Sequence, residues 1–213
     1  MKMNYKCDCN KPNINKNYGY WEDREITSDE MDIIDYLKNN IELENKSILH
    51  IGIGNSFLST QLSCKNNIVY GISVSKNEIK KGESLKNSNY KVIFCDKYSL
   101  NFKELFLNKK FDIIVDNNLK SYACCAISFN SLFENLAYIL NKNGIIITSR
   151  KGMEWYKTLK PKISFNLKKL FHYKFKETEG NPENVLSLKE AKKLGEKYSL
   201  NIYFDEKIYF FKN

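Results

Sequence analysis

The sequence has no long apolar run. No stretch approaches the ~20 consecutive apolar residues that a helix needs to cross a bilayer, and no apolar segment that would act as a signal peptide precedes Cys7. Internal repeats and low-complexity linkers are also absent. These absences predict a cytoplasmic protein with a single folded domain and no membrane partner.

The sequence also lacks a regular cysteine pattern. Its six cysteines do not have the spacing of a disulfide framework, so we expect reduced thiols. Cys7 and Cys9 have no second pair of Cys or His residues nearby, so we expect no metal site. Cys124 and Cys125 stand beside apolar residues and are interpreted as buried packing thiols.

Acidic residues are outnumbered. The 34 Lys and Arg residues against 25 Asp and Glu residues give a net charge of +9, which attracts nucleic acid where it is clustered. The basic residues are mostly Lys and are spread along the whole chain, so a solvated basic surface is the favoured interpretation. Hydrophobic residues make up 42% of the chain, enough for a packed core.

The first 25 residues show no periodic pattern. We interpret them as an N-terminal arm, followed by one domain that spans residues 26–213. The arm is interpreted either as lying over the domain or as partly mobile, and the stretch from Tyr18 to Trp21 is too aromatic for a free tail. This aromatic content is the basis of the hypothesis that the arm closes over the site as a lid. A capping box of Thr27 and Glu30 then predicts a helix that ends near Asn40.

From Lys46 onward, short apolar segments alternate with helical patterns. The clearest helical pattern runs from Phe129 to Leu140. Alternating strands and helices predict an α/β fold, in which right-handed crossovers place helices on both faces of a parallel sheet. The predicted strands are Ser47–Ile51, Ile68–Ile72, Lys91–Cys95, Phe111–Asp116 and Gly144–Ser149.

The C-terminal residues break this alternation. Ser187 and Glu190 form a second capping box, which predicts a helix over Leu188–Tyr198. The apolar segments Leu200–Phe204 and Lys207–Phe211 follow, and only Asp205 and Glu206 separate them. A connection that short permits only an antiparallel hairpin.

A glycine-containing turn follows the first predicted strand. The residues from Ser47 to Ser59 read SILHIGIGNSFLS, the pattern of a buried strand, a tight turn and a helix. A Cβ atom at Gly52 or Gly54 would block a ligand that lies against the backbone there. The turn therefore predicts a ligand at the carboxyl end of the first strand.

The residues after this turn do not favour a dinucleotide. A dinucleotide site would show a third glycine at the start of the helix and an acidic residue about 20 positions on. Ser56 and Phe57 open the helix here, and the second strand ends in Gly71-Ile72-Ser73. A ligand without phosphates, such as S-adenosylmethionine, is compatible with both departures.

The stretch ILHIGIGNS resembles motif I of class I S-adenosylmethionine-dependent methyltransferases. The resemblance covers roughly residues 46–213 and implies a Rossmann-like three-layer sandwich. Its sheet would have seven mostly parallel strands in the order 3-2-1-4-5-7-6, with the C-terminal hairpin antiparallel. The stretch YGISVSKNEI, from Tyr70 to Ile79, resembles the cyclopropane and mycolic acid synthase branch, in which a hydroxyl residue replaces the ribose-binding acid.

The resemblance also implies cofactor contacts. Gly52 and Gly54 would contact the methionine and ribose parts of S-adenosylmethionine, and Ser73 and Glu78 would lie near the ribose hydroxyls. Glu78 follows Ser75 by three residues, so a capping role explains it equally well. The other residues that match family positions are Asp96 near the adenine amino group, Asp116 to Asn118 (with Asn117) near the methyl group and substrate, and His50, which replaces an acidic residue. Asp96 also suits the start of a turn.

Methyl transfer from a sulfonium mainly requires alignment and exclusion of water. For a hydroxyl acceptor a general base would help, and the candidates are Asp116, His172 and His50. A hydrogen-bonded structural histidine is the favoured interpretation of His50. The residues predicted to contact the substrate from the arm are Tyr18, Tyr20 and Trp21.

The favoured function is methyl transfer to a small-molecule acceptor, either an anion or a hydroxyl of a sugar or metabolite. An RNA methyltransferase is an alternative, although its fourth-strand motif would resemble N-P-P-Y rather than the Asp116 to Leu119 sequence DNNL. The sequence is also compatible with a non-catalytic nucleotide-binding protein of the same fold and with a nucleotide-binding oxidoreductase.

Overall fold

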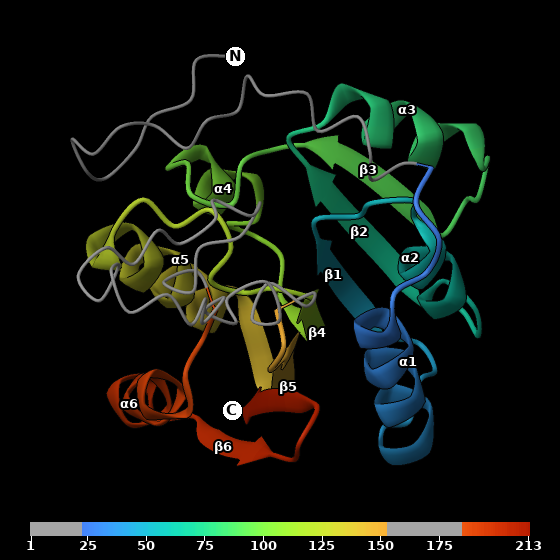
Figure 1. Cartoon of the computed structure of the whole chain (residues 1–213). Helices are drawn as coiled ribbons and strands as arrows, with labels where there is room; N and C mark the ends of the chain where they lie inside the picture. The colour runs from blue at the N-terminus through green and yellow to red at the C-terminus, as the bar shows by residue number, and fades with distance from the viewer. Residues whose placement is uncertain (1–22, 153–184) are drawn as a thin grey trace, which may run out of the picture.

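The computed structural model describes residues 23–152 and 185–213 of the chain. It contains one seven-stranded sheet in the order β3-β2-β1-β4-β5-β7-β6 (Figure 1). This order and the antiparallel C-terminal hairpin confirm the predicted fold. The strands are β1 (Ser47–Ile51), β2 (Ile68–Ser73), β3 (Tyr90–Phe94), β4 (Phe111–Asp116), β5 (Leu140–Ser149), β6 (Asn201–Phe204) and β7 (Ile208–Lys212).

Six helices of the described ranges cover the two faces of the sheet (Figure 1). One face packs against α1 (Ser28–Asn40), α2 (Phe57–Leu62) and α3 (Lys76–Ser84), and the other against α4 (Asn101–Leu105), α5 (Ala126–Ile139) and α6 (Leu188–Tyr198). This arrangement is the three-layer sandwich expected from alternating strands and helices. None of these helices is long and apolar enough to cross a membrane.

Local sequence signals fix the ends of several helices. At the start of α1, the Thr27 hydroxyl accepts a hydrogen bond from the Glu30 N–H, and the Glu30 carboxylate accepts one from the Thr27 N–H. Ser187 and Glu190 form the same reciprocal pair at the start of α6. Each cap satisfies N–H groups that the helix itself leaves unpaired, typically contributing about 1 kcal/mol. Both predicted capping boxes are confirmed.

The central strands are buried on both faces. In β1, Ile48 belongs to the core beneath α1 and α2, whereas its neighbour Leu49 belongs to the core beneath α5. Because side chains alternate along a strand, a continuous apolar run of this kind is typical of a parallel sheet covered by helices on each side. The two cores enclose β1 between its neighbours β2 and β4 inside the sheet.

β5 is longer than predicted. It begins at Leu140, directly after α5, and its pairing with β4 shifts register between Phe111 and Ile113. β7 then pairs with β5 in antiparallel orientation, with Ser149 opposite Ile208. The pairing of β5 with β7 rather than β6 leaves β6 at the edge of the sheet.

Strand order reverses between β1 and β4, and this reversal positions the ligand site. β1 is followed along the chain by β2 on one side, whereas β4 lies on its other side. In open α/β sheets, a crevice opens at such a switch point, outside the carboxyl ends of the strands. Gly52, Ser73, Asp96 and Asp116 all stand at or just after these strand ends.

Gly71, inside β2, offers a test of the packing of β2 against the turn after β1 and against Tyr90 at the start of β3. A Cβ atom at this position would lie 2.7 Å from Ile53 Cγ2 and 2.7 Å from Tyr90 Cε2. We expect Gly71→Ala to lower the free energy of unfolding by about 1–3 kcal/mol, because neighbouring side chains must leave their rotamers. Urea unfolding measures this loss, with Lys80→Ala on exposed α3 surface as the control. Equal stability of both variants would contradict the packing described here.

Candidate active site

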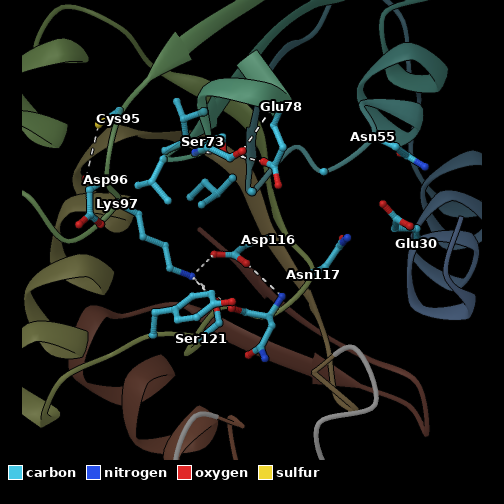
Figure 2. A pocket seen from close by; sticks show the side chains of 18 of the residues that line it. Glu30, Asn55, Ser73, Glu78, Cys95, Asp96, Lys97, Asp116, Asn117 and Ser121 are labelled. Atoms are coloured by element: carbon cyan, nitrogen blue, oxygen red, sulfur yellow. Dashed lines mark hydrogen bonds and ion pairs between the residues drawn. The ribbon is translucent and has the colours of Figure 1, made fainter. Parts of the chain in front are cut away.

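A cavity lies at the carboxyl ends of the four strands β1 to β4 (Figure 2). Its wall comes from the loops after these strands and from the segment before and at the start of α1. The lining residues after the strands include Gly52, Gly54, Asn55, Ser73, Val74, Ser75, Glu78, Cys95, Asp96, Lys97, Tyr98, Asp116, Asn117, Asn118, Ser121 and Tyr122. Arg24, Glu25, Thr27 and Glu30 line it from the α1 side.

Bare backbone forms the floor of the cavity at the β1 turn. Gly52 has φ +75° and Gly54 has φ +50°, both in the left-handed region that glycine adopts without strain. A Cβ atom built on Gly52 would meet no heavy atom within 4 Å, so the space above this peptide is open. The Gly52 N–H is held by the Ile72 carbonyl at 2.9 Å, which fixes the turn beside β2. A ligand can therefore lie directly against this backbone.

At the end of β2, the Ser73 hydroxyl donates a 2.6 Å hydrogen bond to Oε2 of Glu78 (Figure 2). Both residues are buried and line the cavity. Ser75 caps α3 by accepting from the Glu78 N–H, but its own N–H goes to Ser73 Oγ, so the second half of a capping box is not formed. The Glu78 carboxylate thus reaches the cavity wall beside a serine hydroxyl, which a simple helix cap does not require.

Asp96 follows β3 and is 4% exposed. Its Oδ1 atom accepts a hydrogen bond from the Tyr98 N–H at 2.9 Å, and its carbonyl accepts one from the Ser99 hydroxyl. Asp96 therefore does start a turn, one of the two roles that the sequence suggests. The same turn places Asp96 in the cavity wall, so the two roles are compatible.

Lys97 is a cavity residue that the sequence reasoning missed. Its ammonium forms a 2.7 Å ion pair with Oδ2 of Asp116, and both side chains are almost completely buried. It also donates to the carbonyls of Asn118 and Leu119 at 3.2 Å and to Ser121 Oγ at 3.0 Å. One buried cation therefore ties the loop after β3 to the loop after β4.

Both carboxylate oxygens of Asp116 are engaged. Oδ2 pairs with Lys97, and Oδ1 accepts a hydrogen bond from the Asn118 N–H at 3.0 Å. Each carboxylate oxygen is therefore already used by a partner within the protein, which holds the side chain in one orientation. Asp116 lines the cavity as predicted, but this geometry favours a positioning role. Its catalytic role stays a prediction.

Asn117 differs from its neighbours in its hydrogen bonding. Its side chain is 4% exposed and lines the cavity, and its buried Oδ1 atom has no hydrogen-bond partner among the residues that the structure describes. The neighbouring Asn118 side chain instead donates to the Gly152 carbonyl at 3.1 Å. Buried amide oxygens are nearly always hydrogen-bonded, so Asn117 is the natural position for a ligand's donor.

The α1 side of the cavity was also missed from the sequence. Glu30, singled out only as a helix cap, is buried and lines the cavity. Asn55 also lines the cavity, and its amide donates to the Arg24 carbonyl at 2.6 Å. This bond attaches the segment before α1 to the turn after β1. The capping box was a visible signal for Glu30, but the cavity role depends on how α1 packs beside β1.

His50 is not in the cavity wall. It is completely buried, and its Nδ1 atom is hydrogen-bonded to Ser59 Oγ of α2 at 2.7 Å. Burial lowers the pKa of His50 to about 3, so the ring is neutral near neutral pH. Strand alternation turns this side chain toward α2, away from the ligand side, which does not support the predicted cofactor contact. The structural interpretation of His50 fits its position better.

Four predicted site residues lie outside the described residues. They are Tyr18, Tyr20 and Trp21 of the arm and His172, so their substrate and catalytic roles stay predictions. Among the residues that are described, no three His, Cys, Asp or Glu side chains are grouped so that they could hold a metal ion. Cys124 and Cys125 are half-buried rather than buried, because the loop that carries them reaches the surface beside α5.

The buried neutral His50 predicts a pH effect on stability. Below pH 6.5 an unfolded histidine takes up a proton, whereas the folded ring stays neutral down to about pH 3. Stability is therefore lost as pH falls through this window, by about 2 kcal/mol between pH 7.5 and pH 5 from this residue. In urea unfolding, His50→Gln should lose less stability than the wild type over that range. Identical losses would contradict this assignment.

The Lys97–Asp116 pair predicts that a single substitution causes a large loss of unfolding free energy. Lys97→Met leaves the Asp116 charge buried without its partner, which should cost about 3 kcal/mol of unfolding free energy. Adding Asp116→Asn should restore part of that loss. Lys207→Met, which removes an exposed ion pair with Asp32, is the matched control and should leave the urea midpoint nearly unchanged. A similarly small shift for Lys97→Met would show that the buried pair is not formed.

Comparisons with known proteins agree with the ligand cavity that the geometry describes. A family model described as a methyltransferase domain matches residues 42–198, which is more than half of the chain. A search of curated proteins found no significant sequence match.

Three similar solved structures are methyltransferases. The N-methyltransferase NodS from Bradyrhizobium japonicum WM9, in complex with S-adenosyl-L-homocysteine, is 13% identical with a TM-score of 0.57, covering 89% of each chain. A TehB-like SAM-dependent methyltransferase from Corynebacterium glutamicum is also 13% identical with a TM-score of 0.57, covering 90% of each chain. A SAM-dependent methyltransferase from Clostridium acetobutylicum is 15% identical with a TM-score of 0.58, covering 93% of this chain and 92% of that one.

Sequence identities this low show a shared fold. The family match is separate evidence, and it extends through the strands and loops that form the cavity. The predicted methyltransferase resemblance is confirmed, and S-adenosylmethionine as the predicted cofactor agrees with these comparisons. The narrower likeness to the cyclopropane synthase branch stays a prediction. The chain therefore belongs to the methyltransferase domain family.

Proposed function

We propose that this methyltransferase transfers the methyl group of S-adenosylmethionine to a small-molecule acceptor. The observation that carries the proposal is the open peptide at Gly52, where even a Cβ atom would meet nothing within 4 Å. It lies at the switch point of the sheet, where α/β folds bind their ligands. The family match to a methyltransferase domain supports methyl transfer as the reaction proposed for this cavity.

The residues of the cavity fit the polar groups of the cofactor. Gly52 offers bare backbone at the turn, and the Glu78 carboxylate beside the Ser73 hydroxyl offers acceptors for the two ribose hydroxyls. Asp96 offers a carboxylate for the adenine amino group. The cofactor supplies a methyl group already activated by its sulfonium, so the protein's task is alignment and exclusion of water rather than activation of the methyl carbon.

Glu78 takes the ribose position in this assignment. The family's usual acid at the end of the second strand is replaced here by Ser73. The helix α3 supplies a carboxylate at the end of β2 instead. Glu78 lies in the first turn of this helix and accepts a 2.6 Å hydrogen bond from the Ser73 hydroxyl. A serine and a glutamate from consecutive elements thus replace one acid at the strand end.

Asn117 takes the acceptor position. Its buried Oδ1 atom has no partner among the described residues and lines the cavity next to Asp116. An acceptor that carries an N–H or O–H group would satisfy this oxygen and be oriented by it. Lys97 and Asp116 hold the Asn117 loop in place, since the same ammonium bonds to Asp116 and to the Asn118 carbonyl. Their role in the reaction is therefore to position the acceptor loop.

The charges of the cavity wall favour a small acceptor over RNA. Within the described part of the wall there are five carboxylates, Glu25, Glu30, Glu78, Asp96 and Asp116, against two basic groups, Arg24 and Lys97. Lys97 is already paired with Asp116. A polyanion binds through clustered Lys and Arg, and this wall would repel phosphates. The same charges favour a neutral or basic acceptor over the anionic one considered from the sequence.

The ribose assignment is tested by Glu78→Gln. Removing the charge weakens two hydrogen bonds to the ribose, so the dissociation constant for S-adenosylhomocysteine should rise about tenfold or more. Glu83→Gln, on the exposed face of the same helix, is the matched control and should bind as the wild type does. Equilibrium dialysis with each purified protein gives the three constants.

The binding constants distinguish a wrong ribose assignment from a wrong proposed function. If Glu78→Gln and Glu83→Gln both bind like the wild type, the ribose assignment is wrong but the proposed function stands. If the wild-type chain binds neither S-adenosylmethionine nor its demethylated product, the proposed function is wrong.

A further inference from the structure

Two thiols lie together beside the cavity, and the methyltransferase assignment does not use them. Cys124 and Cys125 are half-buried, and their sulfur atoms are 3.8 Å apart. Ser121 and Tyr122, just before them in the chain, line the cavity. Neighbouring residues of an extended chain normally point their side chains in opposite directions, so this close approach is a specific feature of the loop.

The start of α5 holds one of the two sulfurs. Cys125 is the N-cap of this helix, and its Sγ accepts a hydrogen bond from the Ser128 N–H at 3.4 Å. The first N–H groups of a helix carry partial positive charge, which stabilises a negative atom placed there. A sulfur that binds a metal or metalloid does so as thiolate. The cap therefore orients Cys125 and supports the charge it would carry when bound.

The sulfur separation matches a bidentate thiolate site. Two thiolates on one tetrahedral ion, each about 2.3 Å from it, lie about 3.8 Å apart. The observed distance is the same, so a single ion could bind both sulfurs with little movement of the loop. Because the described residues contain no group of three or more His, Cys, Asp and Glu side chains able to hold a metal, the pair suits ligands that need only two protein sulfurs.

We propose that Cys124 and Cys125 form a two-thiolate binding site for a soft, thiophilic ion or trivalent metalloid. Soft ligands of this type prefer thiolate to oxygen or imidazole donors. The site is distinct from the cofactor contacts assigned above, and it stands at the end of the loop that carries Asn117 and Tyr122.

Phenylarsine oxide is a suitable probe because it bonds stably only to paired thiols. Its arsenic stays trivalent throughout: two As–S bonds form, the arsenic–oxygen bond breaks, and the two thiol protons leave with that oxygen as one water molecule. The full chain carries another closely spaced pair, Cys7 and Cys9, so the experiment starts from the C7S/C9S variant. Intact-protein mass spectrometry then counts bound phenylarsenic groups in the presence of excess glutathione.

We expect one phenylarsenic group on the C7S/C9S protein, released by an added small dithiol. Adding C64S should leave this adduct unchanged, since Cys64 is an exposed thiol just after α2, which packs on the opposite face of the sheet from α5. Adding C124S or C125S should abolish it. Serine is itself a preferred N-cap residue, so C125S retains the cap of α5. Thermal melting by circular dichroism checks that each variant is folded.

Peptide mapping of the adduct on the C7S/C9S protein gives an answer that does not depend on the Cys124 and Cys125 variants. Crosslinked sulfurs at these two residues support the proposal. An adduct mapped elsewhere, an adduct that survives C124S, or no adduct that resists glutathione would overturn it.

Discussion

The site depends on one steric constraint: the chain must leave β1 with no side chain over the peptide at Gly52. Apolar side chains pack against β1 from both faces of the sheet, and this packing fixes the position of its end. The turn then uses two left-handed glycines, Gly52 and Gly54, which no β-branched residue could replace without strain. The same sheet brings the ends of β2, β3 and β4 to this point. Their polar side chains surround the open peptide rather than cover it.

The buried pair of Lys97 and Asp116 connects the two halves of the site. The loop after β3 carries Asp96 on the proposed adenine side, and the loop after β4 carries Asn117 on the proposed acceptor side. One ammonium with four oxygen partners holds them at a set separation. Alignment is the main requirement of methyl transfer, so a rigid link between cofactor and acceptor loops has a direct chemical purpose.

The sequence predicted those parts that depend on local patterns. The capping boxes, the alternation of strands and helices, and the antiparallel C-terminal hairpin each depend on a few neighbouring residues, and each was confirmed. The connection within the hairpin is three residues long rather than two, because β7 begins at Ile208. Lys97 was missed because its partner Asp116 is 19 residues away, at the end of a different strand. The expected strand order places β2 and β1 between β3 and β4, so the sheet topology alone does not suggest this contact. His50 was assigned to the cavity by family position, but strand alternation directs it to α2.

The most direct test of the open Gly52 peptide is a crystal structure of the chain with S-adenosylhomocysteine. We expect the compound to lie against the Gly52 backbone, with its ribose next to Glu78 and its adenine amino group next to Asp96. A turn closed by neighbouring side chains, with the compound bound elsewhere or not at all, would contradict the proposed site.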